Sequence, residues 1–176
     1  MPTFHYPIVA FAFVSSLLNL AIIFGILKYR RSNPYLRGSY FAIVIFHSVT
    51  DVLLACEFTI LMRARKYRYL DFVLYEGSTL WEVLPRLTNG LHYYLKAVLY
   101  IGHVLLSLNR FTSAFYPLSY ETFWRSKLMI SARFIAWVLP LFCILPVVLN
   151  FKFKMWFHMG DDNETVRLES DEVSTQ

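Results

Sequence analysis

The sequence predicts an all-α membrane protein that crosses a bilayer four times. Hydrophobic residues make up 57% of the 176 residues and charged residues only 16%, which leaves too little polar surface to cover a globule in water. The apolar residues gather in four stretches that are each long enough to span a membrane as a helix, at about residues 7–28, 39–62, 87–109 and 128–150. The formal net charge of +5 comes largely from basic residues in the connections between them, where anionic lipids retain such residues. We therefore expect a lipid bilayer, and no nucleic acid, as a partner.

The first apolar stretch sets the expected orientation. Residues Met1 to Leu27 contain no Lys, Arg, Asp or Glu, and Lys28, Arg30 and Arg31 follow at once. Because basic flanks stay in the cytoplasm, we expect the amino terminus outside. The basic run Arg63 to Arg68 would then also lie outside, so the charge bias favours this orientation only narrowly.

The polar side chains inside the predicted spans include Asn19, Asp51, Glu57 and Lys96. Such groups are costly in lipid and are expected to face other helices. Asn19 and Asp51 have similar depth, which predicts a hydrogen bond between the first two helices; a protonated Asp51 that simply holds helices together is the alternative. Glu57 and Lys96 lie at neighbouring levels in the outer half, which predicts an ion pair.

The third stretch closes on Asn109-Arg110-Phe111, which places a permanently charged arginine where a membrane helix leaves the lipid. Pro117 follows seven residues after Arg110 and has no amide hydrogen. We therefore expect the helix to end there in a shaped loop.

This ending resembles the inner end of the third helix in rhodopsin-like seven-helix receptors. Its continuation from Tyr116 to Trp124, with Tyr120-Glu121 and Trp124 in a Tyr-Glu-x-x-Trp pattern, resembles the nematode serpentine chemoreceptors of the class gamma and class V branch. The resemblance covers about residues 7–150, and it implies that the four stretches correspond to the first part of a seven-helix receptor bundle.

The resemblance also implies functional roles. Full-length relatives would sense an external small-molecule chemical and pass the signal to a heterotrimeric G protein. A ligand cavity at Glu57 and Lys96 is one of these roles, but a structural ion pair would explain the same two residues equally well. The residues concerned are Asn109, Arg110, Phe111 and Pro117 for G-protein coupling, Asn19 and Asp51 for an intramembrane polar network, and Glu57 and Lys96 for a ligand cavity.

Residues 159–176 are acidic and rich in hydroxyl side chains, so we expect a disordered tail after a receptor domain that spans residues 1–158. The tail contains Asn163-Glu164-Thr165, an acceptor pattern for N-glycosylation, which takes place only on the lumenal side. Four crossings from an outside start would place Asn163 there.

Two expected receptor features have no counterpart in the sequence. Three further apolar stretches are missing, and Cys56 and Cys143 both fall within apolar stretches, where they cannot form the outer disulfide usual in rhodopsin-like receptors. We therefore expect a truncated receptor, a short isoform or a shortened gene model. Such a chain would not signal by itself, and it would lie in the plasma membrane or be retained in the endoplasmic reticulum.

Two other functions stay open. One is a non-signalling four-helix protein that partners or escorts other receptor chains, and the less favoured one is a small transporter lined by Asp51, Glu57 and Lys96. An inverted repeat would favour transport, and the two pairs of stretches show none. No nucleophile with a base, metal-ligand cluster or phosphate-binding loop is visible, so we expect no enzyme activity, metal or cofactor. His92 and His103 are interpreted as satisfied helix residues.

Overall fold

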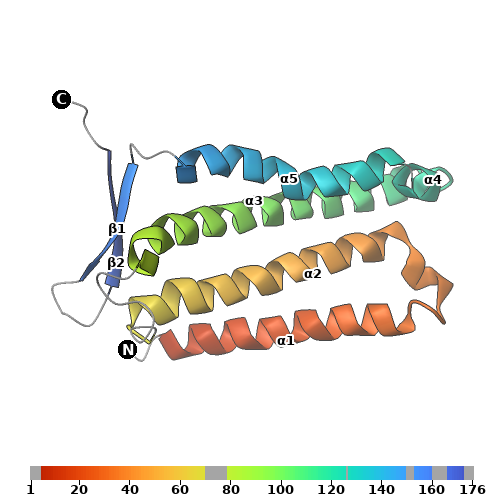
Figure 1. Cartoon of the computed structure of the whole chain (residues 1–176). Coiled ribbons are helices and arrows are strands. Elements are labelled where there is room, and N and C mark those ends of the chain that lie inside the picture. The colour runs from red at the N-terminus through yellow and green to blue at the C-terminus, as the bar shows by residue number, and fades with distance from the viewer. Residues whose placement is uncertain (1–4, 70–78, 126, 150–152, 160–165, 173–176) are drawn as a thin grey trace.

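The computed structural model describes residues 5–69, 79–125, 127–149, 153–159 and 166–172. Within this part of the chain, four long helices run side by side in alternating directions, with short elements at their ends (Figure 1). The elements are α1 (His5–Tyr29), the 3-10 helix η1 (Pro34–Arg37), α2 (Ser39–Glu57), the π-helix η2 (Phe58–Ala64), α3 (Thr79–Phe115), α4 (Tyr120–Arg125), α5 (Lys127–Leu149), β1 (Phe153–Met159) and β2 (Val166–Glu172).

The bundle has two distinct ends (Figure 1). The α4 end carries η1, α4 and the first turn of α2, and the hairpin end carries the β1–β2 hairpin and the starts of α1 and α3. Along the bundle α1 packs on α2, α2 packs on α3, and α3 packs on α5. Because the chain passes along the bundle four times, His5 and Phe153 lie at the same end.

Length and composition suit these helices to a membrane. α1, α2 continued by η2, and α3 are each long and apolar enough to cross one. α5 has 23 residues, or about 34 Å at helical rise, around a shorter apolar segment from Arg133 to Pro146. α1 turns bulky side chains outward, since Phe11 and Phe24 are 75% and 67% exposed, as lipid contact requires. The predicted all-α membrane protein is confirmed.

α3 is longer than predicted. It begins at Thr79 rather than near residue 87 and continues past 109 to Phe115, so it extends beyond the predicted apolar stretch at both ends. Pro85 lies inside the helix, where membrane helices tolerate proline.

The predicted end of this helix at proline is confirmed. α3 stops at Phe115, two residues before Pro117, and the amide of Tyr116 makes a last bond of 2.9 Å to the carbonyl of Thr112. A turn then leads into α4, which lies across the end of the bundle (Figure 1).

The prediction of a disordered tail is wrong for Val166–Glu172, which form β2 and pair antiparallel with β1. The register places Leu168 opposite Phe157 and Val166 opposite Met159. The acidic composition of the tail concealed this alternation of apolar positions, which is what a strand needs.

A small hydrophobic core lies near the α4 end. Its buried members come from α2, α3, α4 and α5, so all four elements contribute to it. They are Ile43, Leu105, Trp124 and Ala136. This core fixes α4 against the long helices.

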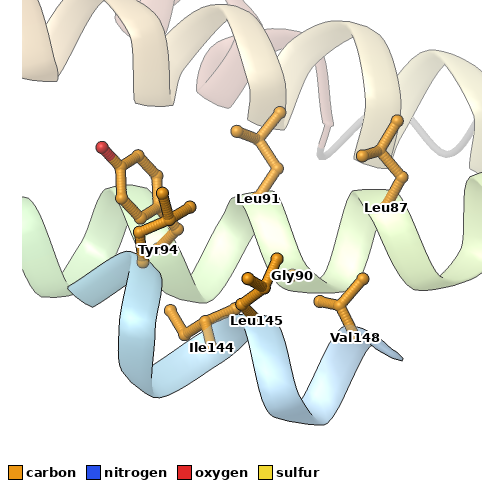
Figure 2. A pocket seen from close by; sticks show the side chains of 8 residues that line it. Leu87, Gly90, Leu91, Tyr94, Ile144, Leu145 and Val148 are labelled. Carbon is orange, nitrogen blue, oxygen red and sulfur yellow. The ribbon is translucent and has the colours of Figure 1, made fainter. Parts of the chain in front are cut away.

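Toward the hairpin end, α3 and α5 approach closely at Gly90. A methyl group at this position would overlap Cγ2 of Val148 on α5, and Figure 2 shows the two residues facing each other. Glycine therefore allows the helices to pack at this distance, as small residues do in membrane interfaces.

We predict that Gly90→Ala lowers the stability of the bundle by about 1–3 kcal/mol, because the added methyl group has no space. Thermal unfolding of the protein in detergent measures this effect. Gly25→Ala is the matched control, since no atom lies within 4 Å of its Cβ position, and this change in α1 should be neutral or stabilising. Equal midpoints for the two variants would contradict the close packing of α3 and α5.

Candidate functional site

Asn109 is the central polar residue of the α4 end. It is 1% exposed, and its Oδ1 accepts a hydrogen bond of 2.9 Å from the hydroxyl of Tyr120 on α4. The Oγ of Ser39, at the start of α2, donates to the same Tyr120 hydroxyl at 3.4 Å. Asn109 and its two partners therefore connect α3, α4 and α2.

Trp124 makes a second connection between α4 and α3. Its ring is 1% exposed, and its Nε1 donates to the hydroxyl of Thr112 at 2.7 Å. That hydroxyl in turn lies 2.9 Å from the carbonyl oxygen of Leu108. The buried indole thus has its polar atom satisfied, and α4 is held on α3 at two points. We call Ser39, Asn109, Thr112, Tyr120 and Trp124 the α4-end cluster.

The other three predicted coupling residues lie on the surface. Arg110, Phe111 and Pro117 are all exposed, and Phe111 stacks on Phe115 with ring centroids 4.5 Å apart. The triplet is therefore divided by the turn of the helix: its asparagine points into the bundle, while its arginine and phenylalanine point out.

The predicted hydrogen bond between Asn19 and Asp51 does not form between the described residues. Asn19 instead donates to the carbonyl of Ser15 in its own helix at 3.1 Å, a bond that is common for asparagine within helices. Asp51 lies 3.8 Å from Nε2 of His47, and the His47 ring packs edge to face on His103 of α3 at 4.3 Å. The polar level in the middle of the bundle thus joins α2 to α3.

Glu57 also has a partner other than the predicted one. Its Oε2 lies 2.9 Å from Nδ1 of His92 on α3, and the two side chains are 2% and 12% exposed. Within the described residues Lys96, one turn further along α3, makes no ion pair with this carboxylate. The predicted ion pair of Glu57 with Lys96 is therefore wrong, and the contact of Glu57 on α3 is with His92.

A pocket of about 380 Å³ lies beside this pair, between α2, η2, α3 and α5. Glu57 lines it, and most of the remaining wall is aliphatic, including Leu53, Ile60, Leu91 and Leu95. We call it the Glu57 pocket. A single buried carboxylate in an apolar wall is the kind of arrangement that orients a small ligand.

A second pocket of about 280 Å³ adjoins it between α3 and α5. Leu87, Leu91 and Tyr94 on α3 and Ile144 and Val148 on α5 line it, and Figure 2 labels these side chains. Leu91 and Tyr94 line both pockets. The Tyr94 hydroxyl donates to the carbonyl of Trp137 at 3.0 Å, which fixes the ring between them.

Sequence reasoning missed three residues of these sites. His92 was overlooked as a partner for Glu57 although it precedes Lys96 by four positions and so shares its helix face. Tyr120 and Trp124 were noted as parts of a pattern, and only the structure shows that α4 buries them against Asn109 and Thr112.

Two further expectations are not decided by the structure. Asn163 lies outside the described residues, so its glycosylation stays a prediction. In the described ranges, no group of three or more His, Cys, Asp or Glu side chains is placed to hold a metal ion.

We predict that Tyr120→Phe lowers stability by about 1–3 kcal/mol, because the buried amide of Asn109 loses the donor to its oxygen. The comparison is Tyr116→Phe, which removes the same hydroxyl from a residue that is 62% exposed and should have little effect. Thermal unfolding of both variants in detergent tests the hydrogen bond. An equally small effect at both positions would show that the bond contributes nothing.

A second prediction concerns the buried pair of Glu57 and His92. His92→Leu leaves a buried carboxylate without its partner and should cost about 3–5 kcal/mol. The double variant Glu57→Leu/His92→Leu should regain most of that stability, whereas Lys96→Leu should lose none. A double variant no more stable than His92→Leu would rule out the pair.

Comparison with known proteins places the chain in a family. Residues 7–170 match the family model of the Srg family chemoreceptors. The chain is 26% identical over 160 residues to Serpentine receptor class V-1 of Caenorhabditis elegans, an alignment that covers 90% of this chain and 50% of that receptor. The chain thus spans about half the length of this curated relative. With four antiparallel helices and a match over nearly its whole length, this protein belongs to the Srg family of chemoreceptors.

Proposed function

We propose that the protein is a serpentine chemoreceptor polypeptide that binds an external chemical between its helices and offers its α4 end to a heterotrimeric G protein. Membership of a chemoreceptor family supports the first part. The observation that carries the second is the division of the Asn109-Arg110-Phe111 triplet, with Asn109 held by Tyr120 and Arg110 left on the surface. The cluster thereby fixes a cation beside the exposed Pro117 turn.

The proposed orientation places the α4 end in the cytoplasm and the amino terminus outside, in the plasma membrane or in the endoplasmic reticulum. The elements of the α4 end are rich in cationic side chains, which membranes retain on the cytoplasmic side. These residues are Lys28, Arg30, Arg31, Arg37, Arg110, Arg125 and Lys127. The hairpin end also carries basic residues, so the family resemblance at Arg110 is the stronger argument for this orientation.

In a receptor that further helices complete, α3 is the element that would transmit the signal. It contributes Leu91 and Leu95 to the Glu57 pocket and Asn109 and Thr112 to the α4-end cluster. A ligand that binds one position of α3 better than another shifts the balance between these positions. Because two hydrogen bonds hold α4 on α3, a movement of α3 would be carried to the α4 end.

The polar level of His47, Asp51 and His103 lies between the two sites. It joins α2 to α3 at half depth, and we assign it the role of an intramembrane polar network that keeps these helices in register. Asn19 would take part only if its side chain left the carbonyl of Ser15.

We predict that the ligand-free chain co-purifies with a heterotrimeric G protein and that Arg110→Ala reduces the recovered G protein about tenfold or more. Loss of an interfacial cation that is fully engaged by a partner commonly has an effect of this size. Quantitative blotting of the G-protein subunits after affinity purification from membranes gives the ratio.

Arg31→Ala is the matched control, because it removes one exposed arginine from the same end of the bundle without touching α3. Recovery of the G protein should stay near that of the unmodified chain. If Arg110→Ala has no effect, or if both substitutions reduce recovery equally, the specific coupling role of Arg110 is wrong.

A further inference from the structure

The carboxylate of Glu57 has an unused acceptor inside the bundle. The side chain is 2% exposed, and only Oε2 contacts His92. The second oxygen, Oε1, is buried without a hydrogen-bond partner within the described structure. A buried polar atom in this state is costly, so the site is stabilised by any molecule that supplies a donor.

Oε1 lacks a hydrogen-bond donor whether Glu57 or His92 carries the proton that the two side chains share. The 2.9 Å contact holds one proton between Nδ1 of His92 and Oε2 of Glu57, and either atom can carry it. In both arrangements Oε1 keeps its lone pairs and carries no hydrogen. A ligand group that only accepts hydrogen bonds would meet oxygen with oxygen and be repelled.

The walls of the Glu57 pocket define the rest of the ligand. Leu53, Ile60, Leu91 and Leu95 line the Glu57 pocket, so they favour an apolar body. The volume of about 380 Å³ is within the usual range for small-molecule sites. The neighbouring pocket in Figure 2, which shares Leu91, offers further apolar space for a longer molecule.

From this geometry we propose that the Glu57 pocket binds a small, mainly apolar molecule that carries one hydrogen-bond-donating head, an amine or a hydroxyl. The head donates to Oε1 of Glu57, and the hydrocarbon part lies against the leucines of α2 and α3. This inference rests on the proposed function, since the molecule is the external chemical of that proposal, and it names its chemical class.

Lys96 is the internal competitor for the same oxygen. It lies one helical turn from His92 on α3, and its flexible stem gives it reach. In the described structure it makes no ion pair with Glu57. Substitution of Lys96 therefore distinguishes two cases. Either Oε1 of Glu57 is free to bind a ligand, or the ammonium group of Lys96 already donates to it.

The test is photolabelling of the full chain in lipid nanodiscs with octylamine that carries a diazirine in its alkyl chain. Mass spectrometry should map labels to residues 53–61 of α2 and η2 and to residues 91–95 of α3. Octylamine and octanol should compete for these labels, whereas heptyl methyl ether, an acceptor of the same size, should compete about tenfold less well because it cannot donate to Oε1. Labels on the exposed face of α1, at Phe11 and Phe24, report membrane partitioning and should not respond to competitors.

Two variants complete the experiment. Glu57→Met should abolish the pocket labels, and unchanged labelling would overturn the proposal. Lys96→Met should leave the pocket labels unchanged. If pocket labels appear only in this variant, Lys96 occupies the site in the unmodified chain and the proposal is wrong. Should Glu57→Met fail to fold, the ranking of octanol against the ether in the unmodified chain still decides: equal competition rejects the donor requirement. Because labelling needs no G protein, it can succeed or fail independently of the co-purification with Arg110→Ala.

Discussion

Hydrocarbon offers no hydrogen-bond partners, and this constraint shapes the whole bundle. Backbone groups are satisfied within helices, which explains why the four long passes of the chain are helical. Polar side chains need partners of their own, and several find one at three levels: the α4-end cluster, the layer of Asp51 with two histidines, and Glu57 with His92. Each level connects α3 to α2, so α3 is the common element of the internal contacts.

The α4-end cluster shows how a short segment is positioned by such contacts. α4 has only six residues, too few to be a stable helix alone. It is held because Trp124 is buried in the core and the polar atoms of Trp124 and Tyr120 reach partners on α3. The exposed Arg110 and Pro117 are thereby presented beside a segment of defined position, which a binding partner needs.

Much of the fold could be predicted from the sequence, because length and composition decide where a helix crosses a membrane. The contact partners of the polar side chains were harder to predict. The depth of a residue in the membrane follows from the helical rise per residue, but the rotation of the helix about its axis does not. This is why Glu57 was assigned to Lys96 instead of His92, one turn away on α3. Asn19 was misjudged for a different reason: its own helix supplies the acceptor at Ser15. Strand β2 was missed because the prediction of disorder rested on the acidic composition of the tail and overlooked the alternation of Val166 and Leu168 with polar residues.

The central claim is that the α4 end faces the cytoplasm and the hairpin end faces the lumen. The most direct measurement is glycosylation of Asn163 in a microsomal translation reaction, with Asn163→Gln as the reference. We expect the unmodified chain to gain the mass of one glycan, sensitive to endoglycosidase, and an acceptor engineered into the η1 loop to stay unmodified. A glycan on the η1 acceptor, with none on Asn163, would place the α4 end in the lumen and contradict this orientation.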